Sequence, residues 1–144
     1  MSAARQPHPH ESAHLHVAGE ATYIDDIPEL RGTLHCAIGM STEAHATLQA
    51  INLDAVRAAP GVVLVITAED IPGVNDCGPI LHDDPILAEG KVHYVGQPVF
   101  AVIAETREQA RAAARLGKID YTPLAAILIP RDGHAAGSYV IPPM

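Results

Sequence analysis

The sequence contains no tryptophan and a single phenylalanine, and aromatic residues make up 3% of its 144 residues. A hydrophobic core must therefore be built from aliphatic side chains, which are available because 48% of the residues are hydrophobic. Domains usually hold about 100–200 residues, so a chain of this length accommodates one domain with tails. A two-domain enzyme is thereby excluded.

Basic residues are also scarce, since nine Lys and Arg stand against seventeen Asp and Glu, for a formal net charge of −8. We expect no binding to a nucleic-acid backbone or an anionic membrane surface, because both need a clustered basic footprint. The longest apolar runs, Val62–Ile66 and Pro98–Ala104, are too short to span a bilayer. Residues 1–16 lack the apolar segment of a secretory signal. These features predict a cytoplasmic protein.

Only two cysteines are present, Cys36 and Cys77. Neither belongs to a Cys-x-x-Cys pair, which argues against a zinc or iron–sulfur site built within the chain. One disulfide is conceivable, but two small reduced side chains are favoured. Glycine-rich nucleotide-binding motifs and the Gly-x-Ser-x-Gly nucleophile motif are absent as well. The chain alone therefore lacks a recognisable catalytic constellation.

The hydrophobic pattern predicts an α+β fold with a mixed sheet. Strands are expected over residues 33–40, 46–53, 62–67, 92–95, 99–104 and 118–121, with 62–67 as a buried strand and a single helical turn over 68–71. The segments 46–67 and 99–121 each predict a short β-α-β unit. An extended N-terminal arm is expected over residues 1–30, the domain over 31–125, and a linker or tail over 126–144. The tail has no closing element, which suggests a fragment of something longer.

Two short helices are predicted from their end signals. Asp54 is expected to cap the first helix, which the Pro60-Gly61 pair ends. Thr106 is expected to cap the second helix, because Gln109 follows at the capping-box spacing. Gly117 is expected to end that helix in the left-handed region, where glycine has no steric penalty.

Titratable clusters offer weak candidates for chemistry. The arm histidines are His8, His10, His14 and His16, and paired imidazoles bind zinc, nickel or copper. No fixed carboxylate or thiolate accompanies them, so a solvated arm is favoured over a small metal carrier. The acidic pairs Asp25-Asp26 and Asp83-Asp84 invite a general acid–base interpretation, but turn and cap roles are favoured.

Residues 74–90 form a long predicted loop, which is uncommon in a compact domain unless it has a role. Its apolar residues Pro79, Ile80 and Leu81 lie between polar flanks. They either fold back onto the core of the domain, or they line a groove or an interdomain contact. The sequence leaves these two alternatives open.

Four blocks carry a family resemblance: residues 10–28 (HESAHLHVAGEATYIDDIP), 60–76 (PGVVLVITAEDIPGVND), 92–116 (VHYVGQPVFAVIAETREQARAAARL) and 119–124 (IDYTPL). In this order, with short gaps, they resemble the aldehyde oxidase/xanthine dehydrogenase a/b hammerhead domain, which belongs to the molybdenum-binding large subunit of xanthine dehydrogenase. Co-linear blocks over about residues 10–125 are far more specific than a single motif. The similarity to bacterial members favours xanthine over aldehydes as the parent substrate.

The resemblance implies a parent enzyme that hydroxylates hypoxanthine and xanthine to urate. Electrons leave its molybdopterin centre through [2Fe–2S] clusters to FAD and then NAD. The hammerhead domain is implied to pack between the iron–sulfur/FAD subunit and the remaining molybdopterin-binding domains. It supplies no catalytic residue, no metal ligand and no cofactor contact, and Gln97 does not match the molybdenum-proximal glutamine of a later segment. The piece alone is expected to be inactive.

The resemblance also implies a role for the long loop. In the family, the loop at residues 78–81 contributes apolar side chains near the mouth of the substrate channel, which here are Pro79, Ile80 and Leu81. Relatives often carry an aromatic residue there, whereas this sequence has only aliphatic ones. At Leu124-Ala125 the family typically has Leu-Pro, so the exit from this domain is less constrained. The alternative hypothesis is a free-standing protein-binding module that kept the fold without enzyme activity.

Overall fold

The computed structural model describes residues 9–139, and the chain divides into two units, Met1–Thr33 and Leu34–Met144. The first unit contains the helix α1 (Ala13–Ala18) and the 3₁₀ helix η1 (Ile24–Asp26). The sequence predicted an extended arm over residues 1–30, and the short helix α1, which it did not predict, lies within that segment. Gly19 ends α1 at a φ of 73°, in the left-handed conformation that commonly terminates helices. This glycine was the overlooked signal for a helix.

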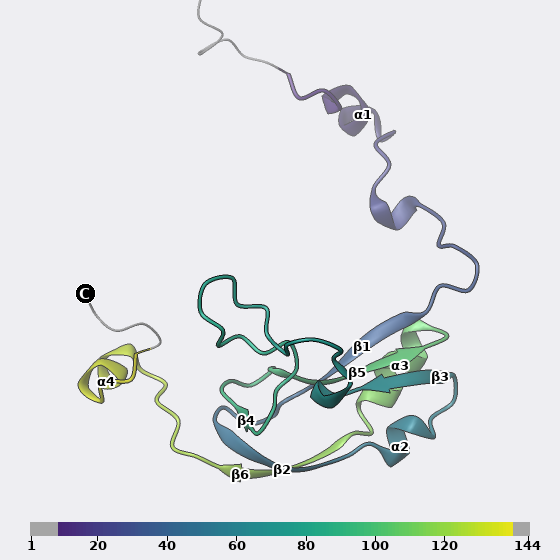
Figure 1. The fold of residues 1–144 in the computed structure, drawn as a ribbon. Helices are drawn as coiled ribbons and strands as arrows, with labels where there is room; N and C mark the ends of the chain where they lie inside the picture. Colours follow the sequence, from purple (N-terminus) through teal and green to yellow (C-terminus); the bar gives the residue numbers. More distant parts are fainter. Residues whose placement is uncertain (1–8, 140–144) are drawn as a thin grey trace, which may run out of the picture. The chain divides into compact units, whose positions relative to one another are not determined.

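The strands of the second unit form two three-stranded sheets. One sheet has the order β1-β5-β3 and the other the order β4-β2-β6 (Figure 1). The strand bounds are β1 (His35–Met40), β2 (Ala46–Asn52), β3 (Val62–Ile66), β4 (Lys91–Val92), β5 (Pro98–Ala104) and β6 (Lys118–Pro123). The helices are α2 (Asp54–Arg57), η2 (Ala68–Asp70), α3 (Arg107–Ala114) and α4 (Pro130–Ala135).

The predicted α+β class is confirmed, but the predicted mixed sheet is wrong because every strand pair is antiparallel. Residues 53–61 between β2 and β3 are fewer than the dozen or more that a parallel crossover needs. The chain instead passes from one sheet to the other at this point. The second predicted unit does the same, since β5 and β6 belong to different sheets.

The core is centred on β5, the middle strand of its sheet, where Phe100 is 1% exposed. Helix α3 covers this sheet with Ala110 and Ala113, which are both buried. The small side chains let the helix approach the strands closely, as the sequence predicted. Thr106 accepts a hydrogen bond at 3.2 Å from the backbone N–H of Gln109, so the predicted helix cap is confirmed.

Several local predictions need correction. Leu53, rather than Asp54, occupies the N-cap position of α2. Strand β3 is not a buried strand, because Val63 and Leu64 are exposed and only Val65 is buried. The predicted strand over 92–95 shortens to the two residues of β4. The φ of Gly117 is not positive, so this glycine does not end α3 in the left-handed conformation.

The predicted tail contains one regular element, α4, which begins at Pro130. Proline is well suited to a first helical position because the N–H it lacks would have no partner there. In residues 9–139, no helix has both the length and the apolar character needed to cross a membrane.

Candidate functional site

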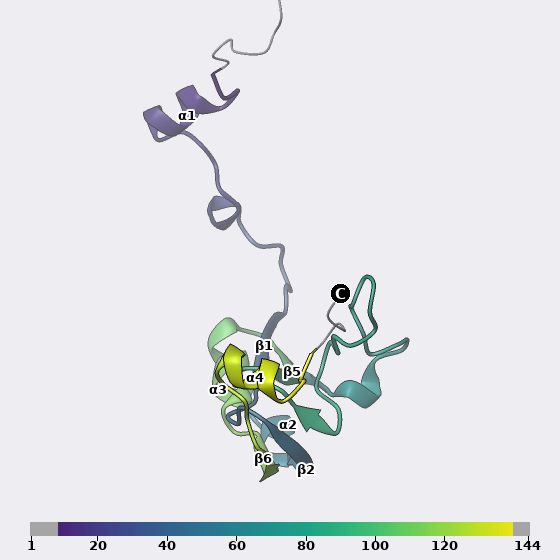
Figure 2. The ribbon, with the colours of Figure 1, turned by 90° about the vertical axis from the view of Figure 1, so that its left-hand side faces the viewer.

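The long segment 71–90 contains no helix or strand, so the loop predicted over residues 74–90 is confirmed. It runs from η2 to β4 and projects away from the strands in both views (Figures 1 and 2). Its neck is closed by a side chain that imitates strand pairing. Nδ2 of Asn75 donates to the carbonyl of Leu87 at 2.8 Å, and the N–H of Leu87 donates to Oδ1 of Asn75 at 3.0 Å. Two reciprocal hydrogen bonds therefore join the ends of the loop.

A second connection lies closer to the tip of the loop. The backbone N–H of Cys77 donates to the carbonyl of Asp84 at 2.9 Å. The Cys77 thiol donates to the same carbonyl at 3.3 Å and to Oδ2 of Asp84 at 3.5 Å. The hydrogen bond to the Asp84 carboxylate, followed by desolvation, raises the pKa of the Cys77 thiol above its ordinary value. Asp83, the other member of this acidic pair, is exposed.

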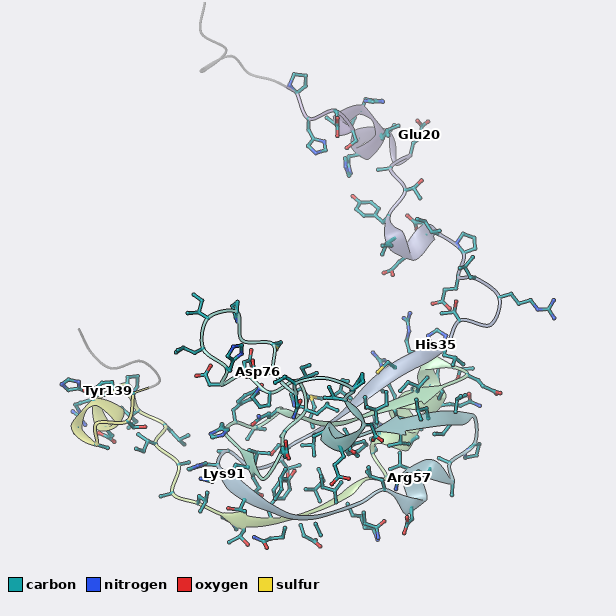
Figure 3. All side chains as sticks on the ribbon, viewed as in Figure 1. Glu20, His35, Arg57, Asp76, Lys91 and Tyr139 are labelled. Carbon is teal, nitrogen blue, oxygen red and sulfur yellow. The ribbon has the colours of Figure 1, made fainter. Side chains whose placement is uncertain are left out.

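Asp76 organises the turn at the base of the tip (Figure 3). Its Oδ1 accepts a hydrogen bond from the N–H of Gly78 at 2.6 Å and lies 3.6 Å from Nδ1 of His82. A Cβ at Gly78 would collide with the backbone carbonyl of Leu81. Only glycine fits at this close approach, and the turn therefore holds residues 79–81 in a defined position.

The apolar tip formed by Pro79, Ile80 and Leu81 points outward rather than folding back onto the core. Ile80 is 86% exposed, and Pro79 and Leu81 are exposed as well. The structure thus combines a hydrogen-bonded neck with an unburied apolar tip. Such a surface is typical of a contact with another molecule or domain. The channel role of these three residues stays a prediction.

The arm histidines do not gather into a group of three in the described part of the chain. The rings of His10 and His16 lie 6.0 Å apart, and Nδ1 of His16 hydrogen-bonds the hydroxyl of Tyr23 at 2.9 Å. His14 is exposed on α1, and His8 falls outside the described residues. No group of three His, Cys, Asp or Glu side chains converges within residues 9–139.

In the acidic pair of the first unit, Asp26 has the capping role that its sequence favoured. Oδ2 of Asp26 accepts a hydrogen bond from the N–H of Tyr23 at 2.9 Å and so caps η1. Asp25 is exposed. Gln97 is buried and has a similar local task, since its Oε1 accepts a hydrogen bond from the N–H of His93 at 2.7 Å.

The sequence reasoning missed the side chains that hold the loop. Asn75 and Asp76 appeared only as polar flanks, although Asn and Asp before a Gly-Pro step are a known signal for side chain-to-backbone hydrogen bonds. It also missed His45 and His93, whose rings stack with centroids 5.8 Å apart. Nδ1 of His45 donates to the carbonyl of Ala125 at 2.7 Å, which fixes the start of the C-terminal segment.

Comparison with known proteins gives a consistent result. Residues 18–125 match the family described as the aldehyde oxidase and xanthine dehydrogenase a/b hammerhead domain. A xanthine dehydrogenase from Oryza sativa subsp. japonica is 42% identical over 138 residues, which are 96% of this chain and 10% of that protein. Aldehyde oxidase 2 from Rattus norvegicus is 46% identical over 123 residues, or 85% of this chain and 9% of that protein.

The fold is similar to part of a solved Cu,Mo-CO dehydrogenase, with a TM-score of 0.75 and 31% sequence identity. The similarity covers 83% of this chain and 15% of that one. The chain thus spans about a tenth of the length of the curated relatives it matches.

Proposed function

The chain belongs to the aldehyde oxidase and xanthine dehydrogenase family of a/b hammerhead domains, and from that premise we propose that it serves as a non-catalytic domain of a molybdenum-dependent xanthine dehydrogenase. The small share of each relative that it covers supports a role as one part of a larger enzyme. The activity proposed for the whole enzyme is the hydroxylation of hypoxanthine and xanthine to urate, in the cytoplasm. The piece alone is proposed to be inactive.

The cofactors of the proposed enzyme are molybdopterin, [2Fe–2S] clusters, FAD and NAD. Within residues 9–139, no group of three His, Cys, Asp or Glu side chains that could hold a metal ion converges. Cys36 lies on β1 and Cys77 in the long loop, so the two thiols do not offer the four ligands of an iron–sulfur cluster. We propose that all of these cofactors are bound by the remaining domains and subunits.

The proposed partners are the remaining molybdopterin-binding domains and the iron–sulfur/FAD subunit. In this arrangement residues 1–30 act as an arm, 31–125 as the hammerhead domain and 126–144 as a linker. Many large apolar side chains of the second unit are exposed, among them Met40, Val63 and Leu64. Burial of such side chains against other domains is favourable, by about 25 cal/mol for each Å² of apolar surface removed from water.

The observation that carries a channel-shaping role is the hydrogen-bonded loop with its apolar tip. Asn75 and Cys77 close the neck of the loop, while Ile80 at the tip is almost fully exposed. A tip held in this way can form one wall of a pocket in a neighbouring domain without ordering on each binding event. Pro79, Ile80 and Leu81 are therefore proposed to line the mouth of the purine channel.

Assembly is tested by affinity purification of the chain from its host, with mass spectrometry and metal analysis of what accompanies it. We expect chains that carry molybdenum, iron–sulfur clusters and FAD. Recovery of the folded chain alone would contradict the proposal and favour the free-standing binding module.

The channel role is tested in the assembled enzyme with Ile80→Asp, using Val74→Asp as a matched control. Val74 belongs to the same loop and is also exposed, but it lies outside the tip. We expect Ile80→Asp to raise the KM for xanthine, because a charged side chain at the mouth of the channel hinders entry of the purine. Val74→Asp is expected to leave KM unchanged. Equal KM values in the two variants would refute the channel role and leave the assembly proposal intact.

A further inference from the structure

Strand β1 forms an edge of its sheet. Within residues 9–139 it pairs with β5 alone, so its other side is not covered by a strand. Natural edge strands usually carry charges or prolines that block pairing with another chain. Residues 36–40, with the sequence CAIGM, contain neither. An unguarded edge of this kind is a template for an additional strand.

A groove of about 710 Å³ runs beside this edge. Residues 36–40 of β1 line one side of the groove, and residues of α3 line the other side. The two elements pack against each other (Figure 1). Ile38 and Met40 are exposed along it, Met40 by 57%. The apolar part of the lining consists of Cys36, Ala37, Ile38, Gly39, Met40, Ala114 and Gly117. The groove therefore offers an apolar surface next to the unpaired backbone of β1.

Two arginines, Arg111 and Arg115, line the same groove, and no carboxylate does. Both side chains are exposed. No ion pair to a carboxylate is present for either of them among residues 9–139. This local positive charge stands out in a chain with a formal net charge of −8. Charge complementarity thus points to an acidic partner.

The spacing of the arginines matches that of a strand. Arg111 and Arg115 are one helical turn apart, which corresponds to about 6 Å along the axis of α3. Alternate residues of a β-strand point to the same face and are separated by about 6.6 Å. Carboxylates at alternate positions of an added strand therefore have a spacing close to that of the two arginines along α3.

The opposite edge of the sheet offers a useful contrast. Strand β3 also lacks charged residues, but the groove beside it is about 260 Å³ and contains a single arginine, Arg57. It has neither the volume nor the paired charges of the groove beside β1. The combination of an open strand, an apolar lining and two spaced arginines occurs at β1.

We propose that the groove between β1 and α3 binds an extended acidic segment of a partner protein. The segment adds a fourth strand to the sheet by pairing with β1, and its carboxylates at alternate positions contact Arg111 and Arg115. Main-chain hydrogen bonds supply affinity, and the charged side chains fix register and direction. This inference does not depend on the proposed enzyme, because it concerns the kind of polypeptide that the surface accepts.

Cys36 provides a reporter, because its exposed thiol lines the groove. Cys77 is an internal control, since it is exposed in the long loop and does not line the groove. The full chain is alkylated in the presence of a peptide of alternating Glu and Val, about eight residues long. We expect the peptide to slow alkylation of Cys36 in a saturable manner and to leave the rate at Cys77 unchanged.

Two matched probes separate the contributions. A peptide of alternating Lys and Val keeps the strand propensity and reverses the charge, so we expect it to give no protection. N-methylation of alternate amides in the Glu peptide removes main-chain donors, and we expect it to abolish protection as well. Protection by inorganic phosphate alone would instead identify an anion site and overturn the proposal. Absence of protection by the Glu peptide at about 1 mM, a weak affinity, would also overturn it.

The arginines are tested by the double substitution Arg111→Glu and Arg115→Glu. Loss of two exposed charge pairs is expected to weaken peptide binding by about tenfold or more. Arg131→Glu is the matched control, because Arg131 is exposed on α4 and lies outside the groove. Arg111→Lys with Arg115→Lys keeps the charges and should retain most of the binding. Circular dichroism and an unchanged rate at Cys77 confirm folding, and undiminished binding by the Glu variant would refute the proposal.

Discussion

The ring of Phe100 occupies the space that a side chain at Gly117 would need. A Cβ built at Gly117 meets Cζ of Phe100 and lies 2.7 Å from its Cε1. Gly39, which pairs with Phe100 across β1 and β5, is blocked by the same ring. The only phenylalanine of the chain thus rests between two glycines. Close packing, rather than backbone conformation, explains glycine at both positions.

The substitution Gly117→Ala is expected to lower the free energy of unfolding by about 1–3 kcal/mol, the usual cost of overpacking a core. Urea denaturation measures this loss. Gly73→Ala is the matched control, since a Cβ at Gly73 meets no atom within 4 Å and its φ is not positive. Phe100→Leu should reduce the cost of Gly117→Ala, because the shorter side chain vacates the site. An undiminished cost in the Phe100→Leu background would favour a conformational role for Gly117 instead.

Local features of the fold were accessible from the sequence because they depend on residues close together in the chain. Thr106 and Gln109 are three positions apart, and their capping hydrogen bond forms as predicted. The pairing of the strands could not be predicted in the same way. The register that joins β2 to β6, from Asn52 opposite Lys118 onward, is a long-range choice that the two hydrophobic patterns do not encode.

In the candidate site as well, local features were predictable from the sequence and longer-range contacts were not. The apolar tip at Ile80 was recognisable as an interruption of a polar loop, because its composition is local. The bonds from Asn75 to Leu87 and from Cys77 to Asp84 join residues that are twelve and seven positions apart. These bonds depend on the path of the loop, and no hydrophobic period or sequence motif predicts them. Gly117 shows the reverse error, since a local helix-end signal concealed a contact with Phe100.

Asp70 is expected to make the stability of the domain depend on acidic pH. Its Oδ2 accepts hydrogen bonds from the N–H of Thr67 at 2.7 Å and from the Thr67 hydroxyl at 2.9 Å. The backbone bond, followed by the hydroxyl bond, lowers the pKa of Asp70 from its ordinary value of 3.8, and Arg57 adds to the effect against an opposing desolvation. A lowered pKa in the folded state means that the ionised carboxylate stabilises the fold.

This contribution is complete above pH 3.8 and is lost as the pH falls through the lower pKa of the folded chain. Asp70→Asn is therefore expected to lower the melting temperature at pH 7 and to flatten its decline below pH 4. Thermal melts across this range measure the effect. Glu69→Gln, at the exposed neighbouring position, is the control and should leave the decline unchanged. Parallel curves for the wild type and Asp70→Asn would contradict the assignment.

Tyr121 carries a hydroxyl that the fold does not use. Its oxygen is buried and has no hydrogen-bond partner among the described residues, whereas its ring packs against the core. A buried hydroxyl without a partner costs about 1–3 kcal/mol of desolvation. Tyr121→Phe is therefore expected to leave stability unchanged or to raise it by about 1 kcal/mol. Urea denaturation with the exposed Tyr94→Phe as control measures the difference, and a clear loss of stability would show that the hydroxyl is bonded.

The neck of the long loop makes a prediction about thiol reactivity. Because the Asp84 carboxylate raises the pKa of the Cys77 thiol, less thiolate is present at a given pH, and thiolate is the reactive form. Asp84→Asn removes the negative charge and is expected to speed alkylation of Cys77 severalfold at pH 8. Asp83→Asn is the neighbouring control, since Asp83 makes no contribution to this pKa. Mass spectrometry resolves the two thiols, and Cys36 should keep its rate in both variants. If Asp84→Asn leaves the Cys77 rate unchanged, the contact between thiol and carboxylate does not persist in solution, and the neck of the loop is held by the Asn75 bonds and by the backbone bond from Cys77 to Asp84.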